Sequence, residues 1–539
     1  MPPAAQWDEP DALIVGAGAS GAAVAWSLAQ AGFRVTCLEQ GDWLAPDVYP
    51  HTRPDWELHR LTDFNPDPNV RGLPADYPVN DLASTFTPLM YNAVGGSTIH
   101  WSAHFPRYHP SDFRVRSLDG VGDDWPLTYD ELAPFYDLSD RMTGVSGITG
   151  DPSQPARSPR GTRPLPIGKL GETIAAGFDK LGWHWWVSDG AINSESYGGR
   201  PPCNLCGPCD LGCPIGARAS ADVTFWPPAL EHGAELRTGC RVREISVSAD
   251  GRARGVVYYD RDGAIHEQRA PLIVLACNGV GTPRLLLNSR SPRFPDGLAN
   301  RSGLVGKNLM FHPFSAVGGV FAKPIELDSM AGPIGSVIFS HEFYETDSKR
   351  DFVRGFGLQI VRQTGPLNTA LGGFPMARVP WGESHHKLFA ERYGQMINIG
   401  VMGEDLPETV NEVTLDPDLT DTHGIPAPLV RYRLSDNSLR MMEYGVARAS
   451  EVLQAAGATE VFVRNPLRPS GWHLLGTCRM GDDSSGSVVD ACGRTHDVDN
   501  LFIVDGSVFV TSGAVNPTTT IQALALRTAD YIKRTRGRT

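Results

Sequence analysis

The sequence predicts a mixed α/β (α+β) fold, in which a discontinuous Rossmann-like domain is wrapped around a domain built on an antiparallel sheet. The apolar run DALIV at residues 11–15 leads into the glycine turn GAGASG, a helix and a second strand. That order is typical of a dinucleotide-binding unit. In the centre of the chain, AVGGVF, SVIFSH, FGLQIV and MINIGVM alternate with a period of two, which indicates antiparallel strands. Near the C-terminus the pattern returns to a strand, NLFIVDGS, and a helix at 518–534.

The remaining segments follow from turn residues. Residues 43–90 are rich in proline, aspartate and aromatic side chains, which predicts irregular structure. Five prolines in residues 151–166 predict an exposed linker. A second strand-and-turn pattern, APLIVLACNGVGTPRLLLNS, occupies residues 270–289. The distribution of these patterns predicts that one domain is assembled from separate parts of the chain.

Length and charge restrict the class of protein. A chain of 539 residues is too long for one compact core, so two or three domains are expected. The formal net charge of −13 and the absence of a basic run argue against nucleic acid or an anionic membrane as a partner. There is no run of about 18 apolar residues that would span a bilayer. Residues 1–10 do not have the pattern of a signal peptide, which predicts a cytoplasmic protein, with periplasmic export alongside a signal-bearing partner as the alternative.

The first glycine turn predicts a dinucleotide site. Gly16, Gly18 and Gly21 give GxGxxG between a strand and a helix. The first glycine permits the tight turn, the second lets a pyrophosphate approach the backbone, and the third lets the helix pack against the strand. Glu39 ends the next strand, where a carboxylate would accept hydrogen bonds from ribose hydroxyls. This fingerprint alone does not separate NAD from FAD.

Four cysteines lie within eleven residues and predict an iron–sulfur cluster. Their spacing, C-x2-C-x2-C-x3-C-P, is that of bacterial iron–sulfur ligation. Glycines and prolines between them supply tight turns. A zinc site and a structural loop of buried free cysteines are the alternatives. The four expected ligands are Cys203, Cys206, Cys209 and Cys213.

Several longer motifs resemble the glucose–methanol–choline family of oxidoreductases from end to end. YNAVGGSTIHW at 91–101 is similar to the family's loop beside the flavin, and NGVGTPRLLLNS at 278–289 to its second signature. HLLGTCRMG at 473–481 and the segment 487–532 resemble its C-terminal block. The resemblance implies an FAD-binding domain at 8–120, 200–310 and 470–535. A substrate-binding domain would then occupy 121–199 and 311–469.

The resemblance also implies two catalytic residues. His473 matches the family's catalytic histidine, and a neutral imidazole is suited to remove an alcohol proton. Asn516 matches the second catalytic position, where its amide would hold the substrate oxygen. Because Asn-Pro-Thr opens a helix, Asn516 is also expected to be the N-cap, with Pro517 at the first helical position. The expected positive end of this helix would stabilise negative charge on a reduced flavin.

Other residues are expected to contact the cofactor. His100 matches a histidine that is joined covalently to the flavin in some relatives, and an ordinary neighbouring histidine is the alternative. Asp505 matches the aspartate that meets the pyrophosphate and ribityl region in the family. Besides the glycine turn and Glu39, the residues expected to contact the cofactor are Gly95, Gly96, Ser97, His100, Val242, Asp505, Pro517 and Thr518.

The predicted function is oxidation of a CH–OH group to a ketone or aldehyde, with hydride transfer to flavin and His473 as base. Relatives imply a sugar, glycoside or polyol substrate. They also imply a small subunit and a cytochrome c-type acceptor that takes electrons from the iron–sulfur cluster. Three alternatives remain open: an oxygen-using oxidase with structural cysteines, a lyase or steroid or aliphatic alcohol oxidoreductase, and a non-catalytic flavin-binding electron-transfer subunit.

Overall fold

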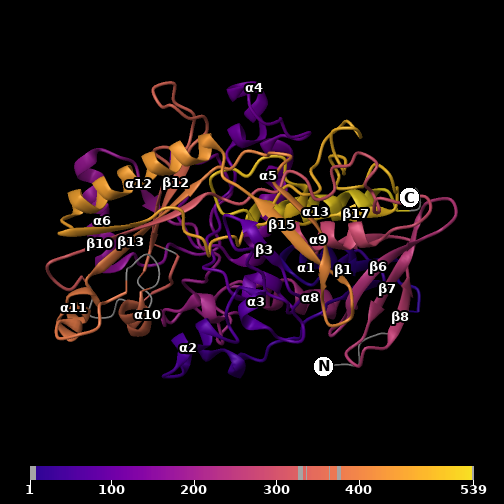
Figure 1. Cartoon of the computed structure of the whole chain (residues 1–539), viewed down its shortest axis with the longest axis horizontal. Helices are drawn as coiled ribbons and strands as arrows, with labels where there is room; N and C mark the ends of the chain where they lie inside the picture. Colours follow the sequence, from indigo (N-terminus) through magenta and orange to yellow (C-terminus); the bar gives the residue numbers. More distant parts are fainter. Residues whose placement is uncertain (1–7, 326–331, 336, 363–364, 373–377, 537–539) are drawn as a thin grey trace.

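The structure is a computed structural model that describes residues 8–325, 332–335, 337–362, 365–372 and 378–536. Two large sheets lie in different parts of the molecule (Figure 1). The parallel sheet and its helices lie toward the right of this view, and the antiparallel sheet toward the left. The predicted mixed α/β fold is confirmed.

The parallel sheet has the strand order β17-β9-β1-β2-β5. Its members come from the two ends and the middle of the chain: β1 (Ala12–Val15), β2 (Val35–Leu38), β5 (Glu235–Arg237), β9 (Ile273–Leu275) and β17 (Leu501–Ile503). In β1, β2, β9 and β17 every residue is buried, as is typical of a parallel sheet that is covered on both faces. The discontinuous Rossmann-like arrangement expected from the sequence is therefore present.

Helices cover this sheet. α1 (Ala19–Gln30) packs against α8 (Trp226–Glu231) and against the last helix, α13 (Thr518–Arg534). α13 also packs against α5 (Tyr129–Thr143), whose N-terminus is closed by a capping box between Thr128 and Glu131. The C-terminal helix thus contacts helices formed from the first 150 residues of the chain.

The antiparallel sheet has the order β16-β10-β13-β12-β11-β4. Its long strands β10 (Phe314–Val320), β12 (Phe356–Val361) and β13 (Met396–Gly403) match three of the four predicted alternating segments. The fourth contains β11 (Ile338–Ser340), while Ser336 lies outside the described residues. The two outer strands are β4 (Trp186–Val187) and β16 (Glu460–Arg464).

Two long helices cover the antiparallel sheet. α12 (Asp436–Ala456) packs on β10, β12 and β13, and α6 (Gly168–Leu181) packs beside α12 (Figure 1). Ser435 caps the start of α12 and Gly457 ends it in a left-handed conformation. The central strands are buried on both faces because α12 covers one face and the interior of the molecule covers the other.

Smaller elements complete the fold. One three-stranded sheet consists of β6 (Arg241–Val247), β7 (Ala253–Tyr259) and β8 (Ile265–Arg269). The other consists of β14 (Glu412–Thr420), β15 (Pro426–Tyr432) and β3 (Asn80–Ser84). The segment 43–90, which was expected to be irregular, contains β3 and the short helices α2 (Trp56–Leu61) and α3 (Pro68–Arg71). Residues 151–166 have neither helix nor strand, and the proposed domain boundaries stay a prediction.

A buried arginine joins the antiparallel sheet to the segment before α5. Arg354 precedes β12, and its guanidinium donates to Glu404 at 2.8 Å, to Asp112 at 2.7 Å and to Asp119 at 2.9 Å. Its side chain is 1% exposed. Buried charges must be paired to be tolerated, so this cluster is satisfied only as a unit. In the part of the chain that the structure describes, no helix is both long and apolar enough to cross a membrane.

We expect Arg354→Met to destabilise the protein by about 3–5 kcal/mol, because three carboxylates lose a shared buried partner. The measurement is the midpoint of thermal unfolding. Arg254→Met is the matched control, since Arg254 pairs with Glu267 on an exposed hairpin and exposed pairs contribute little. Equal midpoints for the two variants would contradict the expectation.

Candidate active site

The glycine turn after β1 forms a tightly packed cradle. Gly16 has a φ of +101°, and a Cβ on it would lie 2.5 Å from the Ala276 carbonyl oxygen. A Cβ on Gly21 would lie 2.0 Å from the Gly16 carbonyl oxygen. Gly18 opens α1 as its N-cap, with no side chain capping the first turn. The first helical N–H groups are therefore available to an anion, as in dinucleotide sites.

The loop at 91–101 lies directly against this turn. The Gly95 N–H donates to the Ala17 carbonyl at 3.0 Å. A Cβ on Gly96, whose φ is +55°, would lie 2.9 Å from the Gly18 Cα. Ser97 Oγ accepts from the Tyr91 N–H at 3.2 Å. The two glycine-rich segments predicted separately from the sequence thus form one cradle, which a side chain at Gly96 would disturb.

Two buried carboxylates flank the cradle. Glu39 accepts from the Ala17 N–H at 2.8 Å and from the Gly41 N–H at 2.9 Å. Asp505 accepts from the Thr282 hydroxyl at 2.5 Å and from the Ser507 N–H at 2.9 Å. Burial raises the pKa of both carboxyl groups, although backbone N–H groups oppose the shift. Both acids lie at the carboxyl ends of strands of the parallel sheet, where ligands of such folds bind.

His100 follows this loop and has one ring nitrogen without a partner. Its Nδ1 lies 2.8 Å from the Asp210 carbonyl oxygen, whereas its Nε2 is buried and has no hydrogen-bond partner among the described residues. The ring lies 4.2 Å from the ring of Tyr91, centroid to centroid. Desolvation lowers the pKa of His100 to about 3, and the nearby Arg71 acts in the same direction. The ring is therefore neutral at physiological pH.

The remaining expected cofactor residues occupy two places. Val242 lies on β6, two residues beyond Cys240, whose N–H donates to the Glu39 carbonyl at 2.8 Å. Thr518 is the first residue of α13, and Pro517 occupies the N-cap position without a side-chain cap. The prediction that Asn516 caps this helix is wrong by one residue. The Asn516 side-chain oxygen instead accepts from another residue, Gln359.

His473 pairs with a second histidine. The Nδ1 atoms of His473 and His312 are 2.9 Å apart, and the ring planes are inclined by 83°. His312 is buried, and its Nε2 lies 3.1 Å from the Ser512 carbonyl oxygen. Burial lowers the pKa of His473 well below its usual range, and the neighbouring His312 and His104 lower it further. His473 is thus a neutral imidazole, the form that can accept a proton.

Asn516 is held by the antiparallel sheet. The Gln359 side chain on β12 donates from Nε2 to Asn516 Oδ1 at 2.7 Å. This contact occupies the amide oxygen and leaves the amide N–H groups of Asn516 to donate elsewhere. The segment 512–516 therefore contacts His312 at one end and Gln359 at the other. Both residues expected to be catalytic are positioned from the sheet by residues that are not themselves in the family motifs.

Sequence reasoning missed three residues of this polar group. Gln359 and His312 lie in or beside buried strands, where the alternating pattern indicates only a core. His104 is 4% exposed and stacks on Phe339 with the ring centroids 4.8 Å apart. Burial lowers its pKa to about 3. The signal that could have found them is a polar side chain inside an otherwise apolar strand, since buried polar groups need partners.

The cysteine loop does not form a ligand cage for a metal. Within the described ranges, no group of three or more His, Cys, Asp or Glu side chains is placed to hold a metal ion. Cys206 is exposed, whereas Cys203 and Cys209 pack against an apolar cluster that includes Phe105 and Ile192. Burial raises the pKa of Cys203 to about 11. The predicted iron–sulfur cluster is therefore not supported.

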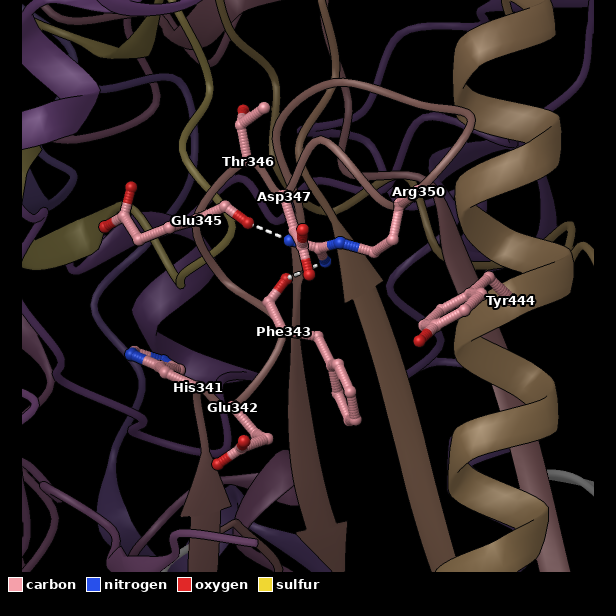
Figure 2. Close-up of a pocket in the computed structure, with 8 residues that line it drawn as sticks. All are labelled: His341, Glu342, Phe343, Glu345, Thr346, Asp347, Arg350 and Tyr444. Carbon is pink, nitrogen blue, oxygen red and sulfur yellow. Dashed lines mark hydrogen bonds between the residues drawn. The ribbon is translucent and has the colours of Figure 1, made fainter.

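A pocket of about 290 Å³ lies beside the antiparallel sheet (Figure 2). Arg350 crosses it and donates to the backbone carbonyls of Phe343 and Glu345, and Tyr444 closes the far side from α12. Neither His473 nor Asn516 lines it. His341, on its wall, lies near Gly357 of β12, where an added Cβ would be 3.4 Å from the ring. The two residues expected to be catalytic have their polar contacts elsewhere, His473 with His312 and Asn516 with Gln359.

Comparisons with known proteins agree on one family. Residues 161–314 and 407–525 match the two family models described as GMC oxidoreductase, and residues 14–76 match a model described as an NAD(P)-binding Rossmann-like domain. The chain is 46% identical to 2-methyl-1,2-propanediol dehydrogenase of Mycolicibacterium austroafricanum, covering 98% of this chain and 96% of that protein. It is 32% identical to the fructose dehydrogenase large subunit of Gluconobacter japonicus, covering 97% of both. The structure of a variant formate oxidase of Aspergillus oryzae has the same fold, with a TM-score of 0.70 at 16% identity over 98% of this chain and 99% of that one.

We expect Gln359→Leu to lower kcat/KM by about tenfold, because the lost hydrogen bond of roughly 1–1.5 kcal/mol frees the Asn516 amide to rotate. The measurement is steady-state turnover of an alcohol substrate. Gln454→Leu on the exposed side of α12 is the matched control. An unchanged kcat/KM in Gln359→Leu would show that Asn516 does not depend on this contact.

Proposed function

Because this chain belongs to the glucose–methanol–choline (GMC) oxidoreductase family, we propose that it is an FAD-dependent dehydrogenase of a primary or secondary alcohol group on a small polyol. The observation that carries the proposal is a set of linked contacts: His473 pairs with His312, His312 meets the Ser512 carbonyl, and Asn516, four residues further on, pairs with Gln359. A chain 46% identical over almost its whole length is named a diol dehydrogenase, which supports the substrate class.

The glycine cradle fits FAD. Gly18 and Gly96 approach each other so closely that a side chain at Gly96 would collide with Gly18, and the start of α1 is uncapped. Glu39 would meet the ribose hydroxyls, and Asp505 the pyrophosphate and ribityl region. Bound FAD would supply a two-electron acceptor for a hydride. In the proposed site the chain would hold this cofactor mainly through backbone groups.

The chain's own residues would then handle the substrate and its proton. A neutral His473 would accept the proton from the substrate hydroxyl while the hydride leaves the same carbinol carbon, so that a C=O bond forms. The Asn516 amide would donate to the substrate oxygen. His104 and Gln359, both buried, would exclude water and fix the surrounding side chains. The protein would thus supply a base, one hydrogen-bond donor and a dry surrounding.

The substrate class divides into two candidates. A small diol is favoured by the relative of highest quoted identity, whose named substrate, 2-methyl-1,2-propanediol, has a hydrogen to give only at the primary carbinol carbon. A sugar or glycoside is the second candidate, favoured by the 32% identity to a fructose dehydrogenase subunit. The same base and amide serve both substrates, since each presents a hydroxyl and a C–H bond on one carbon.

The electrons would leave to a separate acceptor. The name of the fructose relative includes a large subunit, which supports a small subunit as a partner of this chain. A cytochrome c-type acceptor stays a prediction from the family resemblance. The proposal includes no electron path through the cysteine loop, because the described residues include no group placed to hold a metal ion. An oxidase that passes electrons to oxygen is the alternative outcome.

The direct test is turnover by purified flavin-loaded protein with 2-methyl-1,2-propanediol and with fructose, using an artificial dye as acceptor. We expect reduction of the dye with the diol and little hydrogen peroxide in air. His473→Gln should lower kcat by about 10²–10⁴-fold, because general-base catalysis is worth that much. Stoichiometric peroxide would indicate an oxidase. Wild-type turnover in His473→Gln would contradict the assigned base, and no turnover of any alcohol by flavin-loaded wild type would favour a non-catalytic flavin subunit.

Flavin content tests the cradle separately from activity. We expect Gly96→Val to purify with little flavin, because its side chain would collide with Gly18 and the residue must adopt a positive φ. Gly486→Ala, at a position with no close neighbour, should retain the visible flavin spectrum. Equal flavin content in both variants would contradict the assigned cradle.

His100 is our candidate for a covalent flavin bond, since its buried Nε2 lacks a partner among the described residues. A bond from His100 Nε2 would keep FAD attached to the polypeptide. Flavin that stays with the unfolded polypeptide in wild type, and is lost in His100→Ala, would support this bond. Free flavin from both proteins would make His100 an ordinary neighbour.

A further inference from the structure

The contacts of two histidines determine where each carries its proton. The Nδ1 atoms of His473 and His312 are 2.9 Å apart, so one donates and the other accepts. His312 Nε2 lies 3.1 Å from the Ser512 carbonyl oxygen. A carbonyl oxygen can only accept a hydrogen bond. His312 must therefore carry a proton on Nε2.

The charge state of His312 determines whether its Nδ1 carries a proton. The side chain is buried at 1% exposure, and burial lowers its pKa to about 4. At neutral pH it is a neutral imidazole with a single proton, which is already assigned to Nε2. His312 Nδ1 therefore presents a lone pair. It follows that His473 donates from Nδ1 and, being neutral itself, has a free lone pair on Nε2.

We propose that His312 is a positioning residue that holds His473 in the tautomer with its proton on Nδ1, leaving Nε2 as the atom that accepts the substrate proton. This inference rests on the proposed function of His473 as the base. In the proposed reaction the hydroxyl proton would move to His473 Nε2 while the carbinol carbon gives up a hydride, for which bound FAD would supply the acceptor. The Nδ1–H of the resulting imidazolium still donates to His312, which stays neutral.

A neutral partner has a different effect from a carboxylate. A carboxylate beside a catalytic histidine orients the ring and also raises its pKa, because the negative charge favours the imidazolium. His312 orients the ring without adding a charge, so the base remains unprotonated before substrate binds. The Ser512 carbonyl also accepts from the Tyr108 hydroxyl, which ties this acceptor to the core. The chain from Ser512 to His312 to His473 thus fixes both ring orientation and tautomer.

The kinetic test compares two substitutions of His312 in the flavin-loaded protein. His312→Phe retains ring volume but removes the acceptor, so His473 can place its proton on Nε2. We expect kcat to fall by about 10²–10⁴-fold, the cost of the wrong tautomer at a catalytic histidine, with little change in KM. His312→Asn places an amide oxygen near the former Nδ1 position and should recover about tenfold or more of that loss. His266→Phe on the exposed hairpin should leave turnover unchanged.

The spectroscopic test observes the tautomer directly. The ¹⁵N spectrum of histidine-labelled flavin-loaded enzyme, with His473 assigned through His473→Gln, should show Nδ1 protonated and Nε2 unprotonated. In His312→Phe the Nε2-protonated form should appear. A wild-type His473 protonated on Nε2, or a wild-type kcat in His312→Phe, would overturn the inference.

The two tests separate this inference from the proposed function. Full activity in His473→Gln would contradict the assignment of His473 as the base. Loss of activity in His473→Gln together with full activity in His312→Phe would contradict only the positioning role of His312. If His312→Phe does not fold, the wild-type spectrum and the turnover of His312→Asn still test whether His312 fixes the tautomer of His473.

Discussion

The short segment between β17 and α13 is the constraint on which the site depends. At its start, Asp505 binds Thr282 and the turn of Ser507. In the middle, the Ser512 carbonyl accepts from His312, and at the end the Asn516 amide accepts from Gln359. The segment therefore joins the parallel sheet to the antiparallel sheet through specific hydrogen bonds. If it shifted, the expected base, amide and cofactor cradle would lose their relation to one another together.

Burial shifts the pKa values of the ionisable groups in these contacts. His473, His312 and His104 have lowered pKa values chiefly because burial disfavours the imidazolium. Their neutral forms can both donate and accept, which a charged ring cannot do. The Arg354 cluster is the opposite case, since several buried carboxylates share one guanidinium. The polar groups named here are held by hydrogen bonds or ion pairs to specific neighbours, as a rigid catalytic site requires.

The cysteine loop shows that the spacing of cysteines in the sequence is not sufficient to predict a metal site. The pattern of Cys203, Cys206, Cys209 and Cys213 matches a known ligand run, yet spacing specifies only the length of chain between thiols. A cluster requires four sulfur atoms directed at one point. Here two thiols pack against an apolar cluster while a third is exposed. The direction of each side chain depends on turns and packing around the loop, which the pattern does not encode.

The sequence by itself determined the fold class, the glycine turn with Glu39, the family and the identity of His473 and Asn516 as candidates. These follow from local signals: strand and helix periodicity, positions that require glycine, and contiguous motifs. Only the tertiary structure brought Gly96 against Gly18, placed His312 and Gln359 beside the candidate catalytic pair, and moved the helix start past Asn516. The physical reason is that these contacts join residues far apart in the chain, such as His312 and His473, through strands whose sequence indicates only burial. A periodic pattern shows that a side chain points inward, but the partner it meets there depends on how the sheets are packed together.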